Sequence, residues 1–148
     1  MPLAALSGRF PSHTAFRWVI AAGFLAGMAL SPGLWGIGRS YPLAPVLPFL
    51  SVEPSPYGWA WTVVLPALLL AYALTGRRAA GFAFIVVVVL SVLPDLNRLQ
   101  PWVYQYALLL GALLAYTSPK PAWRMILGCT YLWSGILKLN PVFLSQVA

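Results

Sequence analysis

The chain has 148 residues, of which 61% are hydrophobic and only 7% are charged. This balance excludes an ordinary soluble domain and predicts an all-α, polytopic membrane helix bundle, in which residues 1–148 form a single transmembrane helical domain. The formal net charge of +7 comes from nine basic residues that stand singly or in pairs between apolar runs. Because a nucleic-acid-binding surface needs a basic patch, we expect no nucleic-acid partner and interpret these residues as topology signals.

Five hydrophobic runs have about the length that a bilayer-spanning helix requires. In chain order they cover residues 16–36, 57–75, 79–94, 101–117 and 122–140. The first contains the GxxxG pair Gly23 and Gly27, which favours close contact between helices. Pro66 predicts a kink in the second. The sequence therefore predicts about five transmembrane helices.

Two polar or proline-rich segments separate these runs. Residues 37–56 contain five prolines and predict an irregular or re-entrant loop. Between the third and fourth runs stands PDLNRLQP, with Pro94 and Pro101 on either side of Asp95, Asn97, Arg98 and Gln100. Such a stretch is costly in lipid, so it predicts a tight hairpin turn.

The distribution of basic residues predicts the orientation in the membrane. With a cytoplasmic N-terminus, the cytoplasmic segments carry six basic residues and the opposite side carries three. The six are Arg9, Arg17, Arg77, Arg78, Lys120 and Arg124, and the three are Arg39, Arg98 and Lys138. We therefore expect a multi-pass protein of the cell (inner) membrane, with the proline-rich loop, the PDLNRLQP turn and Lys138 on the non-cytoplasmic side.

Groups suited to metal or redox chemistry are scarce. Cys129 is the only cysteine and His13 the only histidine, and the acids are Glu53 and Asp95. The sequence therefore predicts no intramolecular disulfide, no CxxC pair and no metal site. We interpret Cys129 as a small packed residue.

Lys138 near the end of the fifth run has two interpretations. Helical periodicity places it on one stripe with Arg124, Gly128, Tyr131 and Gly135, about 21 Å from Arg124 along the axis. In the first interpretation it snorkels to the lipid headgroups at little cost. In the second it is a partly desolvated general base at a binding site.

The second interpretation of Lys138 requires a polar partner on the same side of the membrane. Asp95 is the candidate, although Arg98, three residues further along the chain, competes for the same carboxylate. A close Asp95–Lys138 pair makes the site structural, whereas an Asp95–Arg98 pair leaves the amine among aromatic residues. The sequence alone leaves both arrangements open.

Two motifs resemble a known family. The segment YLWSGILKLN at 131–140, followed by Phe143, resembles the signature of the vitamin K-dependent γ-carboxylase-like membrane proteins, also called the horizontally transferred transmembrane domain family. The segment DLNRLQPW at 95–102, with Tyr104, is similar to a turn found in bacterial relatives. The resemblance implies that Lys138 matches the proposed catalytic base, which deprotonates vitamin K hydroquinone on the lumenal side. It also implies a substrate site for a quinone-like molecule, formed by Asp95, Arg98, Gln100, Trp102, Tyr104, Tyr131 and Asn140.

The chain departs from the carboxylases in three respects. It has no histidine near Pro101 and Trp102, Leu96 stands where bacterial relatives have glutamine, and only ten residues follow Lys138. Carboxylation of protein glutamate is therefore not expected. For the short C-terminal end, the expectation is either a longer parent protein or a partner that covers the last helix.

Three functions are consistent with these residues. The first is binding of a quinone-like or other lipid-soluble molecule at a non-cytoplasmic site, with Lys138 as base or anchor. The second is a non-catalytic accessory or assembly subunit of a membrane complex, in which the same residues form a structural polar clasp with a membrane-protein partner or in a homo-oligomer. The third is a carrier for a small solute.

Overall fold

All regular structure in the described part of the chain is helical. The computed structural model describes residues 13–35, 42, 44–47, 49, 58–116 and 118–137. In chain order these form α1 (His13–Leu30), α2 (Pro32–Trp35), α3 (Gly58–Thr75), α4 (Arg78–Val92), the 3₁₀ turn η3 (Leu96–Arg98), α5 (Pro101–Ala115) and α6 (Lys120–Leu137). The predicted all-α class is confirmed over these ranges.

The first predicted helix, 16–36, is divided in the structure into α1 and α2. The break lies at Ser31, whose hydroxyl donates a hydrogen bond to the Gly27 carbonyl oxygen at 2.7 Å. Pro32 occupies the first position of α2. Because proline has no N–H group and disfavours helical backbone in the residue before it, α1 ends at Leu30.

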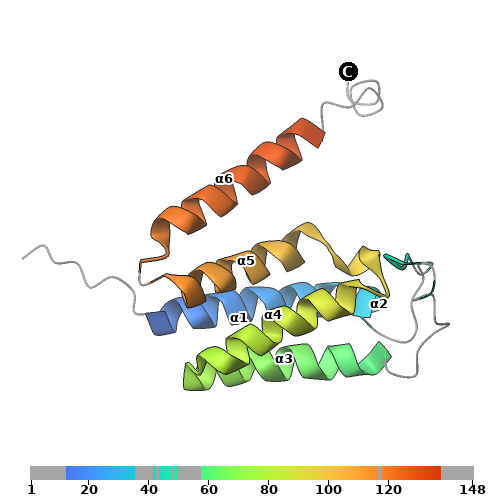
Figure 1. The fold of residues 1–148 in the computed structure, drawn as a ribbon, viewed down its shortest axis with the longest axis horizontal. Helices are drawn as coiled ribbons and strands as arrows, with labels where there is room; N and C mark the ends of the chain where they lie inside the picture. Colours follow the sequence, from blue (N-terminus) through green and yellow to red (C-terminus); the bar gives the residue numbers. More distant parts are fainter. Residues whose placement is uncertain are drawn as a thin grey trace, which may run out of the picture.

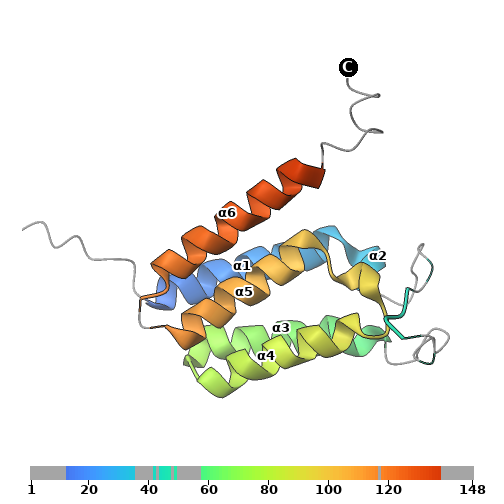
Figure 2. The ribbon, with the colours of Figure 1, turned by 45° about the horizontal axis from the view of Figure 1, so that its top comes forward.

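Helices α1, α3, α4 and α5 pack side by side as an antiparallel bundle (Figures 1 and 2). We call one end of this bundle the basic end; it contains the start of α1, the α3–α4 turn and the α5–α6 turn. The opposite end, which we call the η3 end, contains α2 and the α4–α5 turn. Helix α6 begins at the basic end beside α5 and diverges from the bundle as it runs towards the η3 end (Figure 1).

Aromatic rings from four helices form the core near the η3 end. The Phe24 side chain of α1 is fully buried, and its ring centroid lies 4.9 Å from that of Phe84, 5.3 Å from Trp102 and 6.4 Å from Trp35. These contacts tie α1 to α4, α5 and α2. The edge-to-face geometry of the Phe84 and Trp102 contacts is the arrangement that ring quadrupoles favour.

Helix α6 is attached to the bundle through its first turns. The indole N–H of Trp123 donates a hydrogen bond to the Leu109 carbonyl oxygen on α5 at 3.0 Å, and its ring lies 4.3 Å from the Phe16 ring of α1. Further along α6, Tyr131, Leu132 and Trp133 are exposed. An ideal Cβ built at Gly128 meets no neighbouring atom within 4 Å. The second half of α6 therefore has little packing against the bundle and is stabilised mainly by hydrogen bonds within the helix.

Two arginines cover helix C-termini at the basic end. Gly76 ends α3 with a φ of 69°, a left-handed conformation that favours glycine, and the Arg17 guanidinium lies directly over it. The Arg78 guanidinium donates a hydrogen bond to the Leu114 carbonyl oxygen in the last turn of α5. Both positive charges interact favourably with the negative ends of the helix dipoles.

One helix of the described chain is long and apolar enough by itself to cross a bilayer. It is α1, His13–Leu30, whereas the apolar helical segments Ala60–Thr75, Arg78–Val92 and Pro101–Ala115 are shorter. At 15 residues each, α4 and α5 extend about 22 Å, compared with about 30 Å for the hydrocarbon core of a bilayer.

Replacing Gly27 with alanine is expected to lower the free energy of unfolding by about 1–3 kcal/mol. An ideal Cβ at Gly27 would lie 2.7 Å from Cε3 of Trp102, a ring that is itself packed against Phe24 and Trp35 and cannot easily shift. Gly128→Ala is the matched control. The added methyl group meets open space, and the substitution is expected to be neutral or to stabilise the helix by up to about 1 kcal/mol. Thermal unfolding in detergent, followed by circular dichroism, measures both; equal values would contradict the tight α1–α5 contact.

Candidate functional site

A buried carboxylate organises the turn between α4 and α5. The Asp95 side chain has no solvent-exposed surface, and its Oδ1 accepts hydrogen bonds from the backbone N–H groups of Asn97 at 3.3 Å and Ala44 at 3.5 Å. It thereby caps η3, as aspartate commonly does at the start of a helical turn. The carboxylate also joins the turn to a segment 51 positions earlier in the chain.

Arg98 is the ion-pair partner of this carboxylate. Its Nε lies 3.6 Å from Asp95 Oδ2, and an Nη donates a hydrogen bond to the Ser91 carbonyl oxygen at 3.2 Å. The guanidinium carbon is 5.8 Å from the Trp61 ring centroid and 6.0 Å from that of Trp35, which permits cation–π attraction. The Asp95–Arg98 pair that the sequence allowed is therefore present, whereas Lys138, the other candidate partner, lies outside the described residues.

This charged cluster (Ser91, Asp95, Arg98, Trp35 and Trp61) is enclosed by the protein. Arg98 has only 5% of its surface exposed and Ser91 has none. Both charges contact groups of this chain, and the pair has no net charge. The cluster thus has the properties of a structural clasp that joins α2, α3, α4 and η3.

The proline-rich segment is hydrogen-bonded to the same turn at its described residues. The backbone N–H of Leu96 donates to the Ala44 carbonyl oxygen at 2.7 Å, and that of Val46 donates to the Leu93 carbonyl oxygen at 3.0 Å. The Asn97 side-chain amide donates to the Pro42 carbonyl oxygen at 3.0 Å. The rest of the predicted loop 37–56 lies outside the described residues.

Gln100 and Trp102 line a cavity between the α1–α2 break and the η3 turn. The Gln100 side-chain amide donates a hydrogen bond to the Asn97 carbonyl oxygen at 2.7 Å, which holds the start of α5 against η3. This corner cavity has a volume of about 560 Å³. Its lining consists of Leu30, Ser31, Pro32, Gly33, Leu34, Asn97, Gln100 and Trp102.

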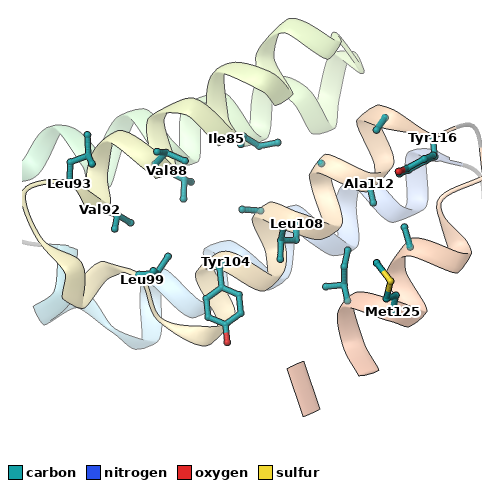
Figure 3. A pocket seen from close by; sticks show the side chains of 16 residues that line it. Ile85, Val88, Val92, Leu93, Leu99, Tyr104, Leu108, Ala112, Tyr116 and Met125 are labelled. Atoms are coloured by element: carbon teal, nitrogen blue, oxygen red, sulfur yellow. The ribbon is translucent and has the colours of Figure 1, made fainter. Parts of the chain in front are cut away.

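A larger, apolar groove lies on the opposite face of α5. This side groove has a volume of about 680 Å³ and runs between α4, α5 and the start of α6 (Figure 3). Ile85, Val88 and Val92 of α4 lie across it from α5, and Met125 is on α6. The full lining is Ile85, Val88, Val89, Val92, Leu93, Leu99, Tyr104, Ala107, Leu108, Gly111, Ala112, Ala115, Tyr116, Ala122, Met125 and Ile126.

A second cavity adjoins the side groove where α6 diverges from α5. This α5–α6 cavity has a volume of about 500 Å³ and shares Tyr104, Leu108, Met125 and Ile126 with the groove. Cys129, Thr130 and Trp133 complete its lining. The shared residues make the two cavities neighbours with a common wall, and Tyr104, Thr130 and Trp133 are the lining residues of the second that have polar side-chain groups.

The structure thus divides the residues predicted for the site. Asp95, Arg98, Gln100 and Trp102 are together at the η3 end. Tyr104 follows in α5 but lines the side groove and the α5–α6 cavity instead. Tyr131 lies on α6 with 76% of its surface exposed. Lys138 and Asn140 lie outside the described residues, and so does the predicted approach of Lys138 to the turn.

Three lining residues of the α5–α6 cavity were not among the predicted site residues. Cys129, Thr130 and Trp133 are three or four positions from each other or from Ile126, so they share one face of α6. That spacing is visible in the sequence, but Tyr131 and Lys138, which were predicted for the site, belong by helical spacing to the opposite face of α6. Among the described residues, no three His, Cys, Asp or Glu side chains come together to hold a metal ion.

Comparison with models of protein families, with curated proteins and with solved structures finds no match to this chain.

Proposed function

We propose that the chain is a multi-pass protein of the cell (inner) membrane, with about five spanning helices and a cytoplasmic N-terminus. Large apolar side chains face outwards along the bundle, among them Val19, Val63, Leu74, Phe82 and Val86. Five basic residues lie at or near the basic end, namely Arg17, Arg77, Arg78, Lys120 and Arg124. In the charged cluster at the η3 end, the charges of Asp95 and Arg98 cancel each other. The positive-inside rule then assigns the basic end to the cytoplasm.

In this membrane protein, we propose that the side groove and the α5–α6 cavity together bind a lipid-soluble molecule, such as a quinone-like compound. The apolar groove suits a hydrocarbon tail, and the α5–α6 cavity, with Tyr104, Thr130 and Trp133, suits a ring with polar substituents. The observation that carries this proposal is the common wall between the two cavities. It puts the two cavities next to each other, so an amphipathic ligand that occupies both has its two parts in adjacent sites.

Lys138 remains the proposed base or anchor for the polar part of this ligand. By helical spacing it belongs to the stripe of Tyr131, on the face of α6 opposite Cys129, Thr130 and Trp133, so this role rests on the family resemblance and not on the position of the cavity. The resemblance to the carboxylase-like family, carried by the segments 95–102 and 131–140, supports the same role. Membership of that family is part of the proposal.

The test is the binding of decylubiquinone to the purified protein in detergent, followed by quenching of tryptophan fluorescence. We expect saturable quenching, and we expect the double variant Leu108→Phe/Met125→Phe to weaken it by about tenfold, equivalent to about 1.4 kcal/mol, because both positions line both cavities. The control is Leu74→Phe, which lies on α3, away from both cavities, and is 69% exposed. Quenching that never saturates, or that is equal in all variants, would indicate simple partition into the micelle.

The accessory-subunit function is the second candidate, because the structure favours a structural role for the charged cluster. Asp95 and Arg98 are buried against this chain's own groups, and the face of α6 that carries Gly128 and Tyr131 is exposed. In this alternative, a membrane-protein partner or a second copy covers that face. Absence of saturable ligand binding, together with a stable complex of larger mass in purification, would favour it over ligand binding.

A further inference from the structure

The side groove extends along the whole of α5. Its lining begins at Leu99, just before α5, and ends at Tyr116, just after it. Since α5 has 15 residues, the groove is about 22 Å long. One leaflet provides about 15 Å, half of a ~30 Å hydrocarbon core, so the groove continues past the bilayer midplane in the proposed orientation.

The floor of the groove offers space at each turn of α5. Ala107, Gly111 and Ala115 follow each other at intervals of four residues, and all three line the groove. An ideal Cβ at Gly111 meets only Cδ1 of Ile85, at 3.8 Å, so the middle of the groove is not filled by a neighbouring side chain. Larger residues at these positions would occupy the space that the structure leaves open.

Polar side-chain atoms occur only towards the two ends of the groove. Only two of the lining residues have a polar side-chain group: Tyr104, towards the η3 end, and Tyr116, at the basic end. The other lining residues are alanine, glycine, valine, leucine, isoleucine and methionine. A ligand lying in the groove therefore needs a long section without any hydrogen-bonding group, because a buried polar group without a partner is costly.

We propose that the groove recognises one hydrocarbon chain that is longer than a single leaflet, as in the long-chain polyprenyl lipids. This inference rests on the proposed function and adds its substrate class. The chain lies along α5 from Tyr104 past Gly111 to Tyr116, with its head in the α5–α6 cavity. An ordinary phospholipid chain, which ends near the midplane, fills only the half of the groove nearer the η3 end.

The experiment measures the affinity of the purified protein for ubiquinones that share one headgroup and carry tails of graded length. We expect affinity to rise with tail length until the tail matches α5 and then to level off. Gly111→Leu, which blocks the middle of the groove, is expected to reduce the affinity for long tails by about tenfold and to leave that for the shortest tail within about twofold. Ala115→Leu, placed deeper in the groove, is expected to affect only the longest tails.

Gly128→Leu is the matched control, since Gly128 is outside the groove and has open space around it. Affinity that is independent of tail length, or a length dependence that neither Gly111→Leu nor Ala115→Leu changes, would overturn the inference while leaving headgroup binding intact. Absence of saturable binding for every tail would instead overturn the proposed function itself. Circular dichroism of each variant shows that the helices are retained.

Discussion

Replacing Arg98 with alanine is expected to lower the free energy of unfolding by about 3–5 kcal/mol. The substitution leaves the Asp95 carboxylate buried without the guanidinium that lies 3.6 Å away, and it also removes the hydrogen bond to the Ser91 carbonyl oxygen. A buried charge that has lost its partner is much more costly than the intact pair is stabilising. The measurement is unfolding in mixed micelles by titration with a denaturing detergent.

Two further variants show whether the charge itself is responsible. Replacing both members, Asp95→Leu with Arg98→Met, removes the two charges together and is expected to be less destabilising than Arg98→Ala alone. Arg124→Ala on α6 removes an exposed arginine and is expected to change stability by no more than about 0.5 kcal/mol. If Arg98→Ala and Arg124→Ala had the same effect, the clasp at the η3 end would not contribute to stability.

Replacing Phe24 with alanine is the second change for which we expect a large effect, a loss of about 3–5 kcal/mol. The Phe24 ring is fully buried and contacts Trp35, Phe84 and Trp102, so its removal leaves a cavity at the place where α1, α2, α4 and α5 meet. These aromatic neighbours are themselves packed together and can fill the space only in part.

Phe82→Ala is the control, because it makes the same substitution at an exposed position. Phe82 lies on α4, has 51% of its surface exposed and faces lipid in the proposed orientation, so its loss is expected to change stability by no more than about 0.5 kcal/mol. Thermal unfolding of the two variants in the same detergent compares them directly. Similar losses would mean that the aromatic contacts at the η3 end do not hold the bundle together.

The positions of the helices could be predicted because length and hydrophobicity are visible in the sequence. Pro94 and Pro101 located the turn between α4 and α5, and the three-residue spacing of Asp95 and Arg98 indicated that these two could pair. Pro32 was an equally clear signal for the end of α1, but the apolar run continues through it to Trp35. Hydrophobicity alone thus hid a break that backbone chemistry makes necessary.

The divergence of α6 and the resulting cavities could not be predicted. They depend on where Trp123 docks onto α5 and Phe16, and on how little space Ala107 and Gly111 occupy opposite α4. No local pattern specifies the angle between two helices, because that angle follows from side-chain packing along the whole contact. Tyr104 was predicted as a binding residue together with Trp102, but it is two positions further along α5, about 200° around the helix, so helical spacing alone separates the two onto different faces.

The contrast between the two ends of the bundle has an electrical consequence. In the proposed orientation, Arg17, Arg77, Arg78, Lys120 and Arg124 all lie on the side that a respiring cell keeps at negative voltage. Carrying any one of these charges to the positive side would cost about 2.3 kcal/mol for every 100 mV of membrane potential. Among the described residues, the η3 end carries only the Asp95–Arg98 pair, which has no net charge, so for these residues the voltage acts on the basic end and opposes inversion of the inserted protein.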